Sequence, residues 1–264
     1  MGDRRGCAIA SMSSYVLGVD ITGGAAEKQG SWRLQVGSRG EMAAWFGGRA
    51  EAEVCQYPEV GGMSPSARGI GAIGSNLQVK DDEALIINCQ NWLRYLSDEP
   101  DEVTFQDSTP RDKFLEIIRG LNPRAVIIVD EDVNQRAKPR SKDRDLLQLS
   151  WMPFDALVTF LPKDNQQRMD YESDIGHKIN NVITFEGPQR IERPEAAAKL
   201  SQRMRNVGFS GLPFGDETVD KVKSLLDEHL SGWGMKREED MMVLTWKGHS
   251  SVFAIAWVTG DDEF

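Results

Sequence analysis

Two short apolar runs, with one amphipathic stretch between them, constrain the fold of this chain more than any other feature. The runs are EALIINC at residues 83–89 and RAVIIVD at 124–130, and each has the length and apolar character of a strand buried on both faces. Between them, Thr109 and Pro110 begin a predicted helix whose apolar residues recur at spacings of three and four until Gly120. A strand, a helix and a second strand in this order predict a right-handed βαβ unit with parallel strands.

The middle of the chain is predicted to be mainly helical. Residues 145–178 have helical character, with interruptions expected at Pro153 and Pro162. Residues 181–185, NVITF, are a candidate third strand. A further amphipathic helix is predicted over 194–208, because it opens with proline and closes with glycine.

The C-terminal part combines one more helix with a hairpin. The helix is predicted over 216–232, capped by its first residue and ended by its last. Residues 242–246 and 249–257 are predicted antiparallel strands, because Lys247 and Gly248 suit a two-residue hairpin turn. The residues therefore predict an α/β fold with parallel strands first and an antiparallel hairpin at the end.

Composition divides the chain near residue 76. Fifteen of the 25 glycines lie at or before Gly74, and the apolar residues there show no sustained period. We expect residues 1–76 to form a glycine-rich irregular or disordered segment and residues 77–264 to form the folded part.

Charge and cysteine content exclude several classes of protein. The net charge of −10 opposes nonspecific binding to nucleic-acid phosphates and to acidic membranes. No apolar run is long enough to cross a bilayer, and the first residues lack the apolar stretch of a secretory signal. Cys7, Cys55 and Cys89 are odd in number and far apart, so neither a disulfide framework nor a thiolate zinc site is predicted. We expect a soluble, intracellular protein.

One glycine pattern matches a nucleotide-binding motif in spacing only. Gly69, Gly71 and Gly74 fit G-x-G-x-x-G, but a breaker-rich loop precedes them and a strand follows. The helix N-terminus that would hold a pyrophosphate is therefore missing, and we predict no nucleotide site.

Three consecutive acidic residues have two interpretations. Asp130, Glu131 and Asp132 follow a predicted parallel strand, where open α/β sheets bind ligands, so they are candidates for a divalent cation or substrate site. A solvated acidic turn is the interpretation that we favour, because no histidine and no phosphate-binding loop lies nearby in the sequence.

Other catalytic patterns are absent from the sequence. His177, His229 and His249 show no metal-ligand spacing, and GFSG at 208–211 lacks the spacing of a nucleophile elbow. We therefore predict no catalytic residue, no metal and no cofactor.

Two groups of residues are candidates for contact or for fold support, and their spacing alone does not separate these roles. Arg190, Glu192 and Arg193 precede a predicted helix, where they form either an ion-pair cluster that braces its start or a surface charge run. The second group is a tryptophan cluster in the C-terminal β-rich part, Trp233, Trp246 and Trp257.

Several longer strings resemble one known family. They are ALIINCQNWLRYLSDEP, GLNPRAVIIVDEDVN, INNVITFEGPQRIERPE, QRMRNVGFSGLPF, LLDEHLSGWGM and VLTWKGHSSVFAIAW, and the resemblance that they carry covers about residues 77–258. Together they resemble the C-terminal half of the plant GRAS proteins, and their residues are most similar to those of the Scarecrow-like branch.

This resemblance implies a fold and a function. It implies a partial Rossmann-like, methyltransferase-like sheet with helices on both faces. It also implies a nuclear transcription regulator, not an enzyme, that contacts zinc-finger transcription factors or other GRAS proteins and binds promoter DNA weakly or indirectly. The alternative is a small-molecule methyltransferase, because the family's sheet resembles that fold.

The chain departs from the family pattern at several positions. His177 and Lys178 replace an arginine–glutamate pair, Leu200 replaces a tryptophan, and Ile255 replaces the serine of a Ser-Ala-Trp ending. The family's leucine-rich helical region and VHIID-type strand are not recognisable before Leu77. We therefore expect a truncated or alternatively read member, whose sheet lacks neighbouring strands.

Overall fold

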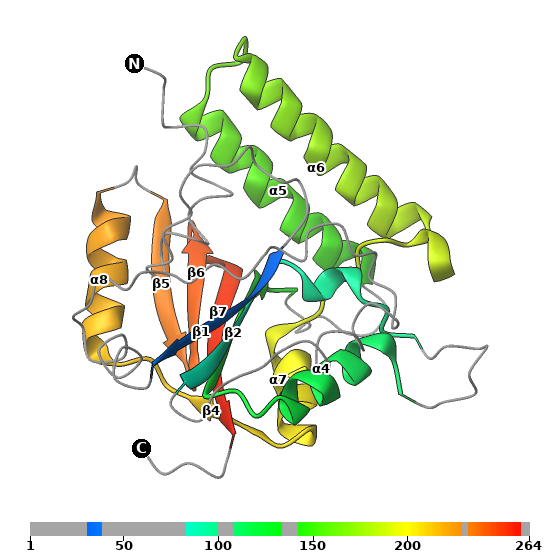
Figure 1. The fold of residues 1–264 in the computed structure, drawn as a ribbon. Helices are drawn as coiled ribbons and strands as arrows, with labels where there is room; N and C mark the ends of the chain where they lie inside the picture. Colours follow the sequence, from blue (N-terminus) through cyan, green and yellow to red (C-terminus); the bar gives the residue numbers. More distant parts are fainter. Residues whose placement is uncertain (1–30, 39–82, 100–107, 134–141, 229–231, 260–264) are drawn as a thin grey trace.

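The computed structural model describes residues 31–38, 83–99, 108–133, 142–228 and 232–259, and these form one seven-stranded sheet with helices around it (Figure 1). The strands are β1 Ser31–Ser38, β2 Glu83–Gln90, β3 Ala125–Glu131, β4 Phe209–Leu212, β5 Trp233–Glu238, β6 Met241–Trp246 and β7 His249–Thr259. The helices are η1 Leu93–Tyr95, α4 Pro110–Gly120, α5 Lys142–Phe160, α6 Gln166–Thr184, η2 Gly187–Gln189, α7 Ala197–Asn206 and α8 Asp216–Asp227.

The predicted βαβ unit is confirmed. β2 and β3 are parallel neighbours, and α4 lies between them in the chain. Thr109 caps α4, because its hydroxyl accepts a hydrogen bond from the Asp112 amide at 3.2 Å, and Pro110 occupies the first turn. This unit places the carboxyl ends of β2 and β3 at one edge of the sheet.

The C-terminal hairpin is also confirmed. β6 and β7 are antiparallel, and Lys247 and Gly248 between them have φ angles of 47° and 83°, as a tight hairpin turn requires. The strand order is β1-β2-β3-β7-β6-β5, with β4 paired to β7. The sequence does not predict β4 and β5, which extend the antiparallel part of the sheet.

The outer edge of β2 carries a partner strand, in contrast to the expectation of missing neighbours. β1 pairs with it in antiparallel register, from Ser31 opposite Gln90 to Ser38 opposite Glu83. The segment 1–76, expected to be irregular, thus includes the strand β1 in its described part. Its other residues lie outside the described part, and the division of the chain at residue 76 stays a prediction.

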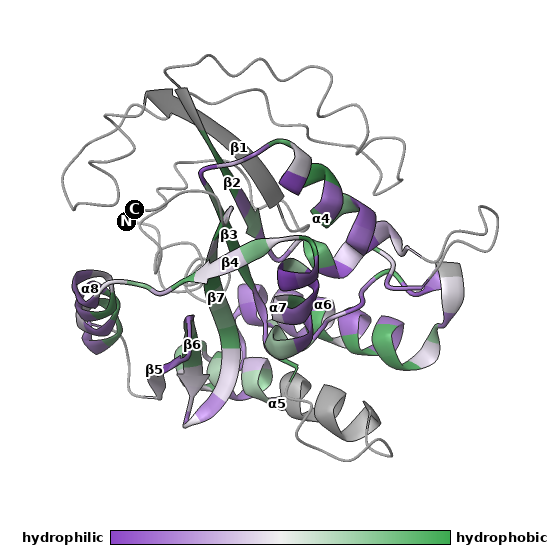
Figure 2. Cartoon of the chain, turned by 90° about the horizontal axis from the view of Figure 1, so that it is seen from below, coloured by the Kyte–Doolittle hydropathy of each residue, from purple (hydrophilic) through white to green (hydrophobic). Residues whose placement is uncertain are grey.

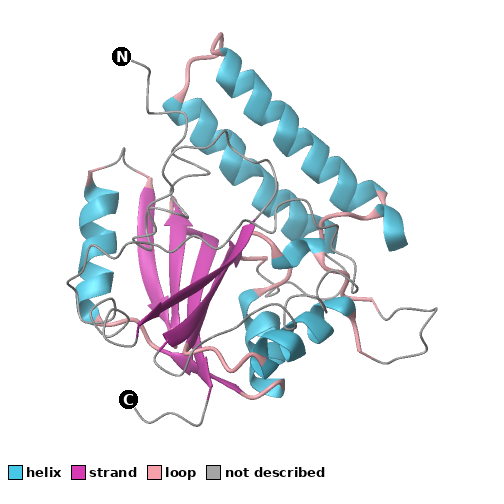
Figure 3. Cartoon of the chain, in the orientation of Figure 1, coloured by secondary structure: helices cyan, strands magenta, loops and turns pink. Residues whose placement is uncertain are grey.

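Two predictions for the helical middle are wrong. Residues 181–185 are not a strand, because α6 continues to Thr184 (Figure 3). Asn165 caps α6, and Ile175, Ile179 and Val182 follow the helical spacing of four and three. Residues 181–184 therefore continue this helical pattern and do not start a strand. α5 likewise runs through Pro153 without ending there.

The cap predicted for the last helix also needs correction. Gly215 is the N-cap of α8, and Asp216 is its first residue. The carboxylate of Asp216 still lies at the positive end of the helix dipole, and Arg237 donates a hydrogen bond to it at 2.7 Å.

Helices cover both faces of the sheet, as predicted. On one face, α4 and α7 pack against β2, β3 and β7 around Phe114, Met204 and Phe253. On the other, Val219 and Val222 of α8 pack against β6 and β5. Figure 2 shows the mostly hydrophobic central strands between these layers. No described helix is long and apolar enough to cross a membrane.

Candidate functional site

Five charged side chains meet at the carboxyl edge of the parallel strands, and we call them the charged cluster. Arg94 lies in η1, directly after β2, and Asp130 and Glu131 end β3. Lys178 comes from α6, and Glu192 comes from the segment before α7. The cluster forms because parallel strands end at the same edge, so the chain segments that follow β2 and β3 come together there.

The members of the charged cluster pair with one another. Arg94, whose side chain is 5% exposed, donates a hydrogen bond to Asp130 and lies 3.0 Å from Glu131. Burial disfavours the charged guanidinium, but the carboxylates of Asp130, Glu131 and Glu192 outweigh it and raise the pKa of Arg94. Burial also opposes ionisation of Glu131, yet Arg94 and Lys178 hold its pKa well below the ordinary value.

Lys178 connects the helical hairpin to the sheet. Its ammonium donates hydrogen bonds to both carboxylate oxygens of Glu131 and lies 3.7 Å from Glu192. α6 thereby contacts the end of β3, from which it is separated in the chain by all of α5.

A second charged group joins α4 to α7. Arg111 is 1% exposed and lies 3.2 Å from Glu195, and Arg203 contacts the same carboxylate at 3.0 Å. Arg203 also pairs with Asp112. Burial works against both ions of this pair, but their mutual attraction and hydrogen bond prevail, so the pKa of Asp112 is lowered and that of Arg203 is raised. Buried pairs of this kind fix how two elements fit together.

The predicted RIER cluster, residues 190–193, divides into different roles. Arg193 is buried and donates hydrogen bonds to the carbonyls of Arg190 and Gly187. Its own amide donates to the Arg94 carbonyl at 2.7 Å, and its carbonyl accepts from Arg111 at 2.7 Å. This one residue therefore holds η1, α4 and η2 together.

The other two residues of that prediction are placed nearer the surface. Arg190 pairs with the exposed Glu186 at 3.6 Å, whereas Glu192 belongs to the charged cluster. The start of α7 is braced by different acids, because Asp132 accepts a hydrogen bond from the Ala197 amide at 3.4 Å and Glu195 binds Arg111.

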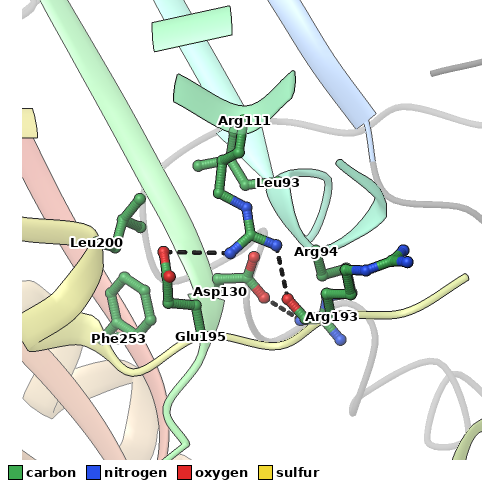
Figure 4. A pocket seen from close by; sticks show the side chains of 8 residues that line it. All are labelled: Leu93, Arg94, Arg111, Asp130, Arg193, Glu195, Leu200 and Phe253. Carbon is green, nitrogen blue, oxygen red and sulfur yellow. Dashed lines mark hydrogen bonds and ion pairs between the residues drawn. The ribbon is translucent and has the colours of Figure 1, made fainter. Parts of the chain in front are cut away.

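Both charged groups line one small cavity, drawn in Figure 4. Arg94, Arg111 and Arg193 converge on it with Asp130 and Glu195, and each of these carboxylates contacts an arginine. Its remaining walls are apolar: Leu93, Leu200 and Phe253. Arg94 pairs with Asp130 and Arg111 pairs with Glu195, so the arrangement stabilises the fold and leaves neither carboxylate as an unpaired base.

The acidic triplet is not a solvated turn, contrary to the interpretation that we favoured. Asp130 is 6% exposed and Glu131 joins two cations, while Asp132 binds the start of α7. Within the described residues, no group of three or more His, Cys, Asp and Glu side chains is placed to hold a metal ion. The Gly69, Gly71 and Gly74 pattern lies outside the described residues.

The three tryptophans do not form a single cluster. Trp233 and Trp246 pack together with ring centroids 5.1 Å apart, and the Trp246 indole donates a hydrogen bond to Asp155 of α5 at 2.7 Å. Trp257 lies elsewhere, in the main core between β3 and β4, beneath Arg205. Trp246 and Trp257 are each 1% exposed, which makes both of them core residues.

Sequence reasoning misses Arg94, Arg111 and Lys178 as site residues. Arginine is usually a surface residue, so the sequence around Arg94 and Arg111 does not indicate that they are buried. Their partners, Asp130 and Glu195, are distant in the sequence. Lys178 is visible in the sequence as a departure from the family pattern and Glu131 as part of the acidic triplet, but the sequence does not show that the two pair with each other.

Comparison with known proteins identifies the family. The GRAS domain family matches residues 69–258, which include both charged groups and all of β7 except its last residue. The chain belongs to the GRAS domain family. It is 42% identical over 180 residues to Scarecrow-like protein 32 of Arabidopsis thaliana, an alignment that covers 67% of this chain and 43% of that protein. Protein SHORT-ROOT of the same plant is 30% identical, with 69% of this chain and 35% of that protein covered.

The fold of this GRAS chain agrees with a solved relative. The crystal structure of SCL7 from Oryza sativa superposes with a TM-score of 0.62 at 22% sequence identity, over 70% of this chain and 51% of that one. The architecture is therefore the Rossmann-like, methyltransferase-like α/β fold. The chain spans less than half the length of Scarecrow-like protein 32 and of SHORT-ROOT.

Proposed function

We propose that this GRAS chain is a nuclear transcription regulator that acts through protein contacts with DNA-binding partners, such as zinc-finger transcription factors or other GRAS proteins. The observation that carries the proposal is the GRAS match over residues 69–258. The relatives named Scarecrow-like and SHORT-ROOT support it.

Electrostatics supports an indirect relation to DNA. The net charge of −10 repels phosphate backbones. Two buried arginines of the cavity, Arg94 and Arg111, are paired with Asp130 and Glu195 and are therefore not free to attract phosphate. Promoter DNA is then reached mainly through a partner that carries the basic surface.

Methyl transfer is the competing function. The carboxyl edge of β2 and β3 is where an open α/β sheet binds a ligand, but in this chain Arg94, Lys178 and Arg193 occupy that edge with their counterions. These charged contacts favour a structural use of the edge.

Two binding measurements test the proposal. In an electrophoretic mobility assay, we expect the chain alone to leave promoter DNA unshifted and to retard further a complex of that DNA with a recombinant zinc-finger domain. Calorimetric titration with S-adenosylmethionine is expected to show no saturable heat. Saturable binding of that cofactor, together with no effect on the zinc-finger complex, would favour the methyltransferase instead.

A further inference from the structure

The large apolar side chains that are exposed within the described residues all lie on or beside one helical hairpin. α5 and α6 pack along each other and project from the sheet (Figure 1). Val158 lies near the end of α5 and is 58% exposed, while Met169 and Ile183 of α6 are 46% and 45% exposed. Ile191, in the RIER segment after α6, is 61% exposed. Single exposed apolar residues are common, but their restriction to one unit marks an interaction surface.

One face of α6 is built to receive an elongated partner. Met169, Ser173, Gly176, Asn180 and Ile183 are spaced by four and three residues, so they share a face, and all five are exposed. The two apolar side chains lie about 21 Å apart along the axis, with small or short side chains between them. A Cβ added at Gly176 would meet nothing within 4 Å, so the middle of the face is low and open. We call these five residues the α6 face.

The segment after α6 extends this face through a side-chain bridge. The side-chain Oδ1 of Asn181 accepts hydrogen bonds from the backbone amides of Ile191 and Glu192 at 2.9 and 3.0 Å, and its side-chain Nδ2 donates to the Gln189 carbonyl at 3.2 Å. These bonds hold Ile191 beside the last turns of α6. The roles of the RIER residues therefore separate, because Arg193 holds the fold while Ile191 presents an apolar side chain to solvent.

The charged residues beside the α6 face indicate the sign of the charge that a binding partner should carry. Asp170 and Asp174 are exposed carboxylates on this helix, next to the exposed His177. The basic residues of α6, Arg168 and Lys178, form ion pairs with Glu172 and Glu131. This exposed side has an apolar side chain near each end and carboxylates along its length. It therefore complements a partner helix whose apolar side chains are flanked by Lys or Arg.

We infer that the α6 face, extended by Ile191, binds a basic amphipathic helix of a partner protein. The inference rests on the proposed function, since DNA-binding domains are rich in Lys and Arg on the helices that face phosphate. Their charge suits an acidic docking surface as well as DNA.

The test uses the full chain and synthetic peptides. The probe is an amphipathic helical peptide of leucine and lysine, and its counterpart has glutamate in place of lysine. Backbone amide chemical shifts of the labelled chain are followed at an ionic strength of about 0.15 M. We expect the lysine peptide to shift amides of residues 166–184 and of Ile191, and the glutamate peptide to leave them unchanged.

Matched variants localise the binding. Ile183→Ser with Ile191→Ser, and separately Asp170→Lys, are each expected to weaken lysine-peptide binding by at least about fivefold without changing the melting temperature. Asp220→Lys on α8 makes the same charge change at an exposed position on a different helix, and should leave binding as it is.

Three outcomes would overturn the inference. One is a set of shifts on another surface, and another is equal binding of both peptides. The third is self-association that the isoleucine variants abolish, because the occupant would then be a second copy of this chain. If peptide binding to the α6 face fails while the chain still regulates a tethered reporter, this inference fails and the proposed function stands.

Discussion

Lys178 of α6 donates hydrogen bonds to both carboxylate oxygens of Glu131 at the end of β3. In the GRAS resemblance this lysine stands where the family has a glutamate. A glutamate here would face Glu131 and Glu192 with no cation from α6 between them. The cation at 178 and the carboxylate at 131 therefore form a matched pair, on which the docking of α6 depends.

A double-mutant cycle tests this pair. Lys178→Glu is expected to lower the free energy of unfolding by about 1 to 3 kcal/mol, because it brings like charges together in a half-buried site. Glu131→Lys should have a similar effect, and the two changes together should restore much of the loss. Urea denaturation measures all four proteins. If the double variant loses the sum of the two single losses, the pair makes no specific contribution.

The two arginines of the RIER segment should differ in their effect on stability. Arg193→Ala removes a buried guanidinium that binds two carbonyls, so we expect a loss of about 2 to 3 kcal/mol. Arg190→Ala removes a pair with an exposed glutamate and should change stability by less than about 0.5 kcal/mol. Denaturant midpoints measure the difference. Equal losses of unfolding free energy in the two variants would show that the buried carbonyl contacts of Arg193 do not contribute to stability.

Truncation of the buried tryptophans should destabilise the fold. Trp246→Ala and Trp257→Ala are each expected to lower the free energy of unfolding by about 3 to 5 kcal/mol, because each creates a cavity in a packed region. Trp233→Ala should have a smaller effect, since Trp233 is only partly buried. Partner binding should fall only through unfolding. Lost binding at an unchanged melting temperature would instead make these tryptophans contact residues.

Gly232 is expected to tolerate no side chain. Its φ is 132°, and an added Cβ would lie 2.7 Å from the Trp246 ring, so Gly232→Ala combines backbone strain with a steric clash. Gly248→Ala is the matched control, because Gly248 also has a positive φ but nothing lies within 4 Å of its added Cβ. Thermal unfolding should show a clearly larger drop for Gly232→Ala than for the control. Similar drops would mean that strain acts alone.

Acid should weaken the attachment of α6. The pKa of Glu131 is lowered in the fold, so its contribution to stability is complete above the unfolded value of about 4.3 and is lost as pH falls through the folded value. Stability should therefore decline as pH falls below about 4, and Glu131→Gln should reduce that decline. Denaturation at several pH values measures the slope, and an unchanged slope in the variant would assign the decline to other carboxylates.

Local sequence patterns are sufficient to predict those helices, strands and turns whose characteristic residues lie within the element itself. The βαβ unit has two short apolar runs and a capped helix, and the 247–248 turn has a glycine where a positive φ is needed. The strand assigned to 181–185 was wrong because a five-residue apolar window does not distinguish a strand from the last turns of a long helix. A proline inside α5 was likewise overridden by the packing of Met152 and Ala156 against Trp246.

The site was less predictable than the fold, because its pairs join distant parts of the chain. The sequence offers Asp130 and Glu131 as candidates for a divalent cation or substrate site and favours a solvated turn, whereas the structure pairs them with Arg94 and Lys178. Arg193 is one of the residues predicted for contact or fold support, and its partners are backbone carbonyls, which no side-chain pattern reveals. The separation of Trp257 from the other two tryptophans follows from sheet order, which the sequence does not state.

The central claim is that this GRAS chain regulates transcription through protein contacts, and a tethered reporter assay tests it most directly. The full chain is fused to a heterologous DNA-binding domain in plant cells, and reporter output is compared with that of the fused Ile183→Ser, Ile191→Ser variant at equal protein level. We predict that the wild-type fusion changes reporter output at least severalfold and that the variant fusion does the same, because the heterologous domain replaces the DNA-binding partner that docks on the α6 face. Reporter output that stays at the level of the DNA-binding domain alone, with the wild-type fusion folded and nuclear, would contradict the claim.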